Sequence, residues 1–469
     1  MHTFVMVLAF VILGLVGTLA AAETQSRPNI ILIVADDLGY GDVSCYGQKR
    51  FTTPHIDRLA NEGIRFTQAY AGSTVCAPSR CSLFTGLHTG HAVVRGNKPS
   101  SERDGFASNT PLPEGTVTWP ALLAQSGYAT GMFGKWGLGA PGNSGEPAKM
   151  GLAEFLGYCD QTEAHDYYPS FLVHNREKMQ LAAGTWSHAV IWDGAMDFVR
   201  KNRNGPFVIL CTVTVPHAKL QVPEADSAPF LTRYADLQGQ AKIDAAAYAG
   251  MITRLDADIG RLLELLQKEG LDKKTLVAFT SDNGPAASGQ PLGYFNSSGG
   301  LRGIKRDLYE GGIRTPLVVR WPGRIAAGQT SDLSCAFWDW MPTACALAGV
   351  KAPTDGDGIS FLPTLLGKAA EQKRHDSLYW EFFEKGTCRA VRFGDWKAVQ
   401  AGFVSAPDGP VELFDLAKDP SEKTDVAAAN PAIIAQARKL LTDSRTAAPA
   451  WEGGGTGEGK GKGKGKNKP

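Results

Sequence analysis

The stretch that decides the fold is Asn29-Ile-Ile-Leu-Ile-Val-Ala-Asp-Asp37, an unbroken apolar run that ends in two carboxylates. Because every position is apolar, rather than every second one, the run predicts a strand that is buried on both faces, as in a parallel sheet. Asp36 and Asp37 then stand at the carboxyl end of this strand, where open α/β sheets bind their ligands. The run therefore predicts both an α/β fold and a charged site at one edge of its sheet.

Apolar strand-like runs alternate with amphipathic helices through most of the chain. The predicted strands are residues 29–35, 129–133, 207–215, 275–280 and 316–321, and the predicted helices include 53–63 and 248–268. This alternation is typical of a large, mixed but mostly parallel sheet flanked by helices. After residue 376 short strands follow one another at 377–383, 390–393, 396–400 and 411–414, before a helix at 432–442. They predict a small C-terminal α+β domain with an antiparallel sheet.

The two ends of the chain differ in composition from the rest. Residues 1–22 are apolar and close on small residues, as in a cleaved signal peptide, although an N-terminal membrane anchor remains the alternative. Residues 446–469 are rich in Gly and Lys and predict a disordered tail. Between them we assign a catalytic domain at 23–375 and the small domain at 376–445. We expect an exported protein, periplasmic or secreted, without a stable membrane span.

Carboxylates and an amide follow two of the predicted strands. Asp36 and Asp37 follow the first strand, and Asp282 and Asn283 follow the strand at 275–280. Three carboxylates at one sheet edge would repel one another unless a cation lay between them. Ligands that are all oxygen favour a hard ion, Ca²⁺ or else Mg²⁺, over Zn²⁺. The alternative for each residue alone is a turn or a helix cap.

Cys76 lies in the segment Ser73-Thr-Val-Cys-Ala-Pro-Ser-Arg-Cys-Ser-Leu-Phe-Thr-Gly86 and has three possible fates. The chain has eight cysteines, so Cys76 could form half of a disulfide in an exported protein. It could also be a thiol-protease nucleophile, which needs a His and an orienting Asn or Asp nearby. The third fate is oxidation to an aldehyde, and the surrounding residues decide between the three.

Positive side chains follow other strands, although the whole chain of 469 residues has a net charge of only +1. That balance gives no support for nucleic-acid binding. Fixed cations stabilise the charge that develops on the oxygens of an anionic ester as the bond to its leaving group breaks, and a His can protonate the leaving alcohol. The candidates for these two roles are Arg80, Lys135, His217 and Lys305. Each of them alone could equally be a solvated or structural residue.

Taken in order, these segments resemble the motifs of the formylglycine-dependent type I sulfatases, which are arylsulfatase A-like members of the alkaline phosphatase superfamily. The resemblance extends from near the N-terminus to about Glu422. It is carried by residues 29–39, 53–60, the Cys76 segment, 134–136, 216–218, 281–284 and 302–314. Any one motif is a weak signal, but the full series in family order is specific.

The resemblance implies a role for each matching residue. Cys76 would be converted to formylglycine by a formylglycine-generating or sulfatase-maturating enzyme, and the hydrate of that aldehyde would attack sulfur. Asp36, Asp37, Asp282 and Asn283 would hold Ca²⁺, which would also touch the hydroxyl group at position 76. Arg80 would orient the hydrate, Lys135 and Lys305 would bind the sulfate, and His217 would help to protonate the leaving oxygen.

One position departs from the family pattern. The family usually has a His two residues after the lysine, in Gly-Lys-Trp-His-Leu-Gly, but here Gly137 stands in that place. That His is thought to assist the release of sulfate, so the base for this step is unassigned, and His165 is our candidate for it.

A sulfated carbohydrate is the substrate that the resemblance favours. The substrate contacts that we expect come from His165 and Trp136, together with Tyr167, Tyr168, Trp380 and Glu381. Two alternatives remain, a phosphate or phosphonate monoester hydrolase of the same superfamily and a non-catalytic glycan-binding relative.

Overall fold

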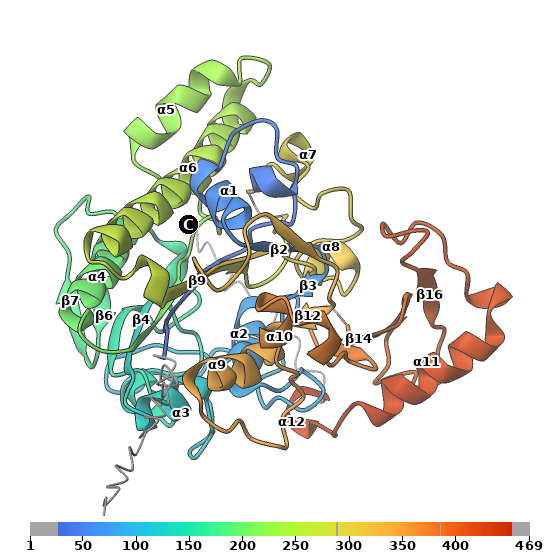
Figure 1. Cartoon of the computed structure of the whole chain (residues 1–469). Helices are drawn as coiled ribbons and strands as arrows, with labels where there is room; N and C mark the ends of the chain where they lie inside the picture. The colour runs from blue at the N-terminus through green and yellow to red at the C-terminus, as the bar shows by residue number, and fades with distance from the viewer. Residues whose placement is uncertain (1–26, 288, 385, 453–469) are drawn as a thin grey trace, which may run out of the picture.

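The computed structural model describes residues 27–287, 289–384 and 386–452. The predicted signal peptide and residues 453–469 of the predicted tail lie outside the described residues. The centre of the molecule is a ten-stranded sheet (Figure 1). Its strands, in spatial order, are β11 (Gln329–Ser331), β2 (Ile64–Phe66), β10 (Leu317–Arg320), β9 (Thr275–Ser281), β1 (Asn29–Ala35), β8 (Phe207–Thr212), β4 (Ala129–Lys135), β5 (Glu154–Tyr158), β6 (Phe171–His174) and β7 (Glu177–Gln180).

The five central strands, β9, β1, β8, β4 and β5, are parallel, as the alternation of strands and helices predicts. β1 shows why its sequence is apolar throughout. Ile30, Leu32 and Val34 belong to the core on one face of the sheet, whereas Ile31 and Ile33 belong to the core on the other face. Because successive side chains point to opposite faces, a strand covered on both sides has no position for a polar residue until it ends.

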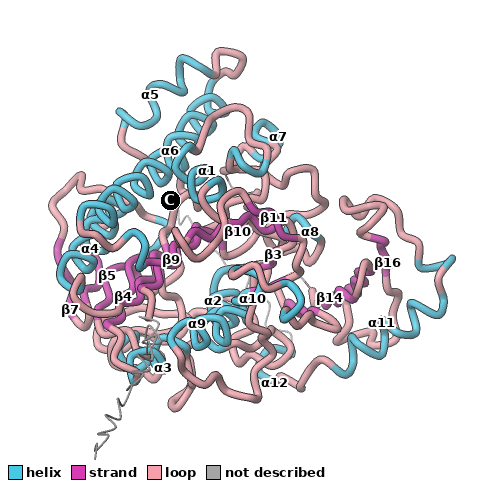
Figure 2. The backbone as a smooth tube through the Cα atoms, in the orientation of Figure 1, coloured by secondary structure: helices cyan, strands magenta, loops and turns pink. Residues whose placement is uncertain are grey.

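Helices cover both faces of the sheet (Figure 2). The helices α2 (Cys76–Thr85), α3 (Trp119–Gln125) and α9 (Trp340–Ala348) pack into one core. The helices α1 (Pro54–Asn61), α4 (Ser187–Asn202) and α6 (Gly239–Lys268) pack into the other, with α5 (Glu224–Arg233) against α6. Shorter helices are α7 (Leu292–Phe295), α8 (Glu310–Ile313) and α10 (Leu362–Leu365). No helix in the described part of the chain has both the length and the apolar character that a membrane span requires.

The C-terminal region forms a second, four-stranded antiparallel sheet, as the sequence predicts. It consists of β13 (Leu378–Phe382), β14 (Cys388–Phe393), β15 (Trp396–Ala401) and β16 (Glu412–Asp415), with α11 (Pro431–Asp443) packed on β14. Trp380 of β13 is buried against Tyr70, and its indole N–H donates to the carbonyl of Ala71 at 3.0 Å. The short pair β3 (Ala69–Tyr70) and β12 (Cys335–Ala336) lies at this junction.

Two features differ from the sequence predictions, whereas β10, which runs antiparallel to β9, agrees with the predicted mixed sheet. α6 begins at Gly239 rather than at residue 248, because its first turns are polar and give no apolar periodicity. The predicted disorder is wrong for residues 446–452. There α12 (Pro449–Glu452) places Trp451 in the core at 8% exposure, where its indole donates to the carbonyl of Val93 at 2.9 Å.

A buried ion cluster joins the two sheets. Lys397 of β15 lies 3.0 Å from carboxylate oxygens of both Glu310 and Glu422, and all three side chains are fully buried. Burial raises the pKa of Glu310, but the charges of Lys397, Arg314 and Arg392 together outweigh it and hold that pKa at about 2. Burial raises the pKa of Glu422 to about 7 in spite of Lys397. Lys397 is therefore one of the cations that keep Glu310 charged inside the protein.

We predict that Lys397→Met lowers the free energy of unfolding by about 3–5 kcal/mol, because it leaves buried carboxylates without their partner. Urea denaturation followed by fluorescence measures this loss. Lys418→Met is the matched control, since Lys418 pairs with Asp415 on the surface, where an exposed pair contributes little to stability. Equal effects of the two substitutions would contradict the role of the cluster.

Candidate active site

The residues that we predicted for the site converge at one edge of the sheet. Asp36 and Asp37 follow β1, Asp282 and Asn283 follow β9, Lys135 ends β4, and His217 follows β8. Because these strands are parallel neighbours, their carboxyl ends meet at the same edge. Cys76 and Arg80 come from the first turns of α2, and Lys305 comes from the loop before α8.

The carboxylates form a tight, fully buried group. The backbone N–H of Asp37 donates to Asp282 Oδ1 at 3.2 Å, and Asn283 Nδ2 donates to Asp37 Oδ1 at 2.7 Å. Asp37 has a φ of +59°, in the left-handed region that non-glycine residues seldom occupy. Backbone strain of this kind is concentrated at functional sites, where the surrounding structure enforces it.

Three cations balance the three carboxylates. Lys135 Nζ lies 2.6 Å from Asp36 Oδ2, Lys305 Nζ lies 2.7 Å from Asp37 Oδ1, and Arg80 Nη2 lies 2.8 Å from Asp282 Oδ2. Burial raises the pKa values of Asp36 and Asp37, but the surrounding positive charges outweigh burial and hold both below the usual range. The pKa of Asp282 is raised to about 6 by burial and by the charge of Asp36.

The donor atoms fit a hard divalent cation. Single ligand atoms of Asp36, Asp37, Cys76 and His217 all lie within 4.8 Å of one another. Asn283 Oδ1 is buried and has no hydrogen-bond partner among the described residues. A buried acceptor without a donor is costly unless a ligand satisfies it, and an amide oxygen beside carboxylates suits Ca²⁺ or Mg²⁺. Asp36, Asp37 and Cys76 of the predicted metal set thus lie together with His217, and the full set with Asp282 and Asn283 stays a prediction.

Cys76 is buried between the two lysines, with its Sγ 3.4 Å from Lys135 Nζ and 3.6 Å from Lys305 Nζ. Burial and the charge of Asp36 raise the pKa of its thiol to about 12. An unmodified thiol would stay protonated here, which disfavours a thiol-protease nucleophile. All eight cysteines lie within the described residues and none forms a disulfide there, so the disulfide interpretation is wrong.

His217 faces the carboxylates and Lys305. Its Nδ1–H donates to the carbonyl of Ala218, so Nε2 is the acceptor, 3.1 Å from Lys305 Nζ and 3.2 Å from Asp37 Oδ2. Burial lowers the pKa of His217 and favours the neutral ring. His165 stacks on it with ring centroids 4.4 Å apart, and burial together with His217 lowers the pKa of His165 to about 4.

A cavity of about 640 Å³ opens over Cys76. Polar side chains share its wall with small apolar ones, and the exposed side chains of Lys219 and Arg306 line it as well. Besides Asp37, His217 and Lys305, which are described above, the polar residues of the wall are Asn97, Asn109, Gln161, Thr162 and His165. Of these, sequence reasoning identified His165 alone, because single polar residues in loops form no pattern that a sequence can reveal.

The prediction that Trp136 contacts the substrate is wrong. Its side chain is 0% exposed, packs on Phe84 with ring centroids 4.8 Å apart, and donates its indole N–H to the carbonyl of Gly145 at 2.8 Å. Tyr167, Trp380 and Glu381 are likewise buried at 0% exposure and belong to the protein interior. Tyr168 is absent from the described lining of the cavity. Aromatic residues near a catalytic lysine are thus structural here.

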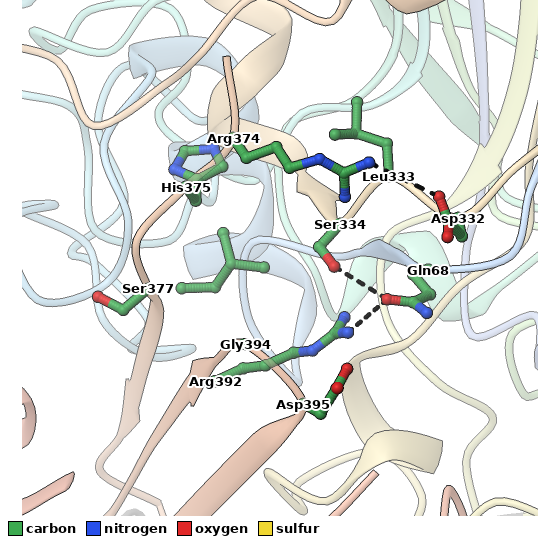
Figure 3. A pocket seen from close by; sticks show the side chains of 11 residues that line it. Gln68, Asp332, Leu333, Ser334, Arg374, His375, Ser377, Arg392, Gly394 and Asp395 are labelled. Atoms are coloured by element: carbon green, nitrogen blue, oxygen red, sulfur yellow. Dashed lines mark hydrogen bonds and ion pairs between the residues drawn. The ribbon is translucent and has the colours of Figure 1, made fainter. Parts of the chain in front are cut away.

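A second pocket of about 200 Å³ lies at the junction with the C-terminal sheet (Figure 3). In its wall Arg374 lies 3.9 Å from Asp332, and Arg392 donates to Gln68 and to the hydroxyl of Tyr70. None of the described catalytic candidates lines it. This pocket is therefore a seam between the two sheets rather than a reaction site.

A wound sheet that gathers carboxylates, cations and a buried helix N-terminus at one edge is typical of hydrolases that act on anionic esters. The comparisons with known proteins specify the class. The family model described as "Sulfatase" matches residues 28–350, and the model described as "N-sulphoglucosamine sulphohydrolase, C-terminal" matches residues 303–446. The chain belongs to the sulfatase family and is a sulfuric ester hydrolase.

Individual relatives are similar over most of the chain. It is 33% identical to human arylsulfatase A, over 91% of this chain and 90% of that protein. It is 31% identical to rat N-acetylgalactosamine-6-sulfatase, over 82% of this chain and 74% of that protein. Among solved structures, Ps i-CgsB in complex with k-i-k-neocarrahexaose is 29% identical, with a TM-score of 0.78 over 91% of this chain and 95% of that one.

We predict that Trp136→Phe lowers stability but spares catalysis. It removes the hydrogen bond to Gly145 and leaves a buried carbonyl unsatisfied, which costs about 1–3 kcal/mol of unfolding free energy. The value of kcat/KM per folded molecule, measured with a sulfated saccharide that the wild type hydrolyses, should change less than about threefold. A large rise in KM at unchanged stability would restore Trp136 as a substrate contact.

Proposed function

We propose that this sulfatase removes sulfate from a sulfated carbohydrate, with Cys76 converted to formylglycine as the nucleophile and Ca²⁺ bound beside it. The observation that carries the proposal is the position of Cys76. Its side chain lies at the floor of a polar cavity, between Lys135 and Lys305 and against Asp36. A protonated thiol is of little use there, whereas the hydroxyl groups of a hydrated aldehyde would be held by the same neighbours.

Each residue around position 76 would then have its own role in the reaction. Lys135 and Lys305 flank the position where sulfur would sit and supply fixed positive charge to the sulfate oxygens. Arg80 is fully buried and donates to the carbonyl of Lys135 and to Asp282, so it fixes the start of α2 against the sheet edge. Lys305 Nζ donates to His217 Nε2, so this pair holds a proton that can pass to the leaving oxygen.

Four residues would hold the metal ion, namely Asp36, Asp37, Asp282 and Asn283, together with the group at position 76. Bound Ca²⁺ would polarise a sulfate oxygen and stabilise the negative charge on the nucleophile. The three carboxylates and three cations already balance, so the ion gives the site a net positive charge that favours an anionic ester. Mg²⁺ is the alternative ion for the same oxygen ligands.

The cavity favours a saccharide over an aryl or steroid leaving group. Its described lining contains no Phe, Tyr or Trp, whereas Asn97, Asn109 and Thr162 offer hydrogen bonds. Lys219 adds positive charge that suits an oligosaccharide with further anionic groups, whereas Arg306 pairs with Glu384 at 3.4 Å. The similar structure of Ps i-CgsB was solved with a neocarrahexaose, which supports the same substrate class.

Maturation and export complete the proposal. Every residue of α2 is buried, including Pro78 and Arg80, so the folded protein does not present the segment around Cys76 to another enzyme, although the cavity admits a substrate to position 76. We propose that a formylglycine-generating or sulfatase-maturating enzyme acts on the chain before it folds, and that the mature protein is periplasmic or secreted. His165 remains our candidate for the base that assists sulfate release.

We predict that Cys76→Ala abolishes turnover, lowering kcat/KM by about 10⁴-fold or more, while the protein folds normally. Activity should be measured with 4-nitrophenyl sulfate and with sulfated saccharides, and folding by circular dichroism. The matched ester 4-nitrophenyl phosphate separates the reaction classes, and the wild type should prefer the sulfate. Undiminished activity of the variant, or a preference for phosphate, would contradict the proposal.

We predict that Asn283→Leu weakens Ca²⁺ binding, because it removes the buried amide oxygen that has no partner in the described part of the chain. Added CaCl₂ should raise the Tm of the wild type, since a ligand that binds the folded state stabilises it, and the rise should be smaller for the variant. Asn204→Leu, at an exposed loop position, is the matched control. An identical rise in all three proteins would exclude Asn283 as a ligand.

A further inference from the structure

Gly137 is the point where a neighbouring side chain fills space that the backbone leaves open. Its φ is +74°, and a Cβ atom added there would lie 1.8 Å from Gln161 Nε2. No side chain at position 137 could share this space without moving Gln161. The amide of Gln161 therefore lies directly over the segment that follows the catalytic Lys135.

The Gln161 amide is buried but unpaired. The residue is 6% exposed, and neither Nε2 nor Oε1 has a hydrogen-bond partner among the residues that the structure describes. Both atoms of a buried amide usually find partners, because an unpaired donor or acceptor loses its contacts with bulk water without compensation. Gln161 also lines the cavity that contains Cys76. An unpaired amide in the wall of a substrate cavity points to a ligand group.

The backbone around Gln161 is held firmly. Its N–H donates to Asn109 Oδ1 at 2.9 Å, and Asp160 Oδ1 accepts from the N–H groups of Thr162 at 2.7 Å and Glu163 at 3.0 Å. These bonds fix the turn that leads into the short helix ending at His165. The turn thus fixes the backbone of Gln161, and a rotation of its side chain would bring the buried amide atoms to a ligand in the cavity.

The chemistry of the two free atoms selects the ligand. Sulfate oxygens of an ester only accept hydrogen bonds, so a sulfate could satisfy Nε2 but would leave Oε1 unpaired. A hydroxyl group both donates and accepts, and a saccharide presents several of them. An aryl group would leave both amide atoms unpaired. A primary amide does not take up a proton near neutral pH, so Gln161 binds and orients rather than transferring protons.

We propose that Gln161 is a specificity-determining residue that binds a hydroxyl group of the sugar leaving group. This inference rests on the proposed carbohydrate sulfatase function and extends it to one named contact. The contact lets the site distinguish a saccharide sulfate from an aryl sulfate, because a site built to bind a hydroxyl disfavours analogues that lack it.

Gln161→Met tests the inference, because Met keeps a similar length and fills the space over Gly137 but forms no strong hydrogen bond. The substrate is whichever of N-acetylgalactosamine 6-sulfate and sulfated carrageenan oligosaccharides the wild type hydrolyses faster. For it we expect kcat/KM to fall about 5- to 100-fold. For 4-nitrophenyl sulfate kcat/KM should stay within about twofold, which also shows that the variant is folded. Gln240→Met, at an exposed position in α6, is the control.

Deoxy analogues of the same saccharide give a second, independent readout. With the wild type, removing the hydroxyl that Gln161 binds should reduce kcat/KM about as much as Gln161→Met does, and combining both changes should add little. Equal losses on saccharide and aryl sulfates, or strictly additive effects with every deoxy analogue, would overturn the inference. If the wild type hydrolysed 4-nitrophenyl sulfate but no saccharide, the proposed function itself would fail, and this inference with it.

Discussion

The rest of the structure depends on the burial of three carboxylates at one edge of the sheet. Asp36, Asp37 and Asp282 would repel one another strongly in a low-dielectric interior unless positive charges came equally close. Those charges arrive from three separate segments, β4, α2 and the loop before α8, through Lys135, Arg80 and Lys305. The cluster is therefore complete only when the whole sheet edge has formed, so the fold and the site assemble together.

Much of this site could be predicted from the sequence because it follows two simple rules. A run such as Asn29–Ala35, apolar at every position, marks a strand buried on both faces, and parallel neighbours bring their carboxyl ends together. The buried position of Trp136 could not be predicted in this way, because no periodicity tells whether a residue just beyond a strand faces the cavity or the core. The role of Gln161 could not be predicted either, because it comes from a contact with Gly137, which only the three-dimensional structure reveals.

The cavity combines two kinds of recognition. At its floor, charge dominates, because Lys135, Lys305 and the metal ligands surround position 76. Along its wall, neutral groups such as Asn109 and Gln161 offer directional hydrogen bonds that depend on the leaving group. In the proposed function, charge at the floor would select the ester, and the wall would select the alcohol to which it is attached. Such a division would explain how one sulfatase scaffold can serve different substrates by changes in loop residues.

The central claim is that position 76 carries an aldehyde in the working enzyme. Mass spectrometry of the tryptic peptide 66–80, from protein produced with a maturating enzyme, tests it most directly. The account predicts formylglycine at position 76. It also predicts that specific activity rises in proportion to the fraction of molecules that carry formylglycine. An unmodified thiol at position 76 in fully active protein would contradict it.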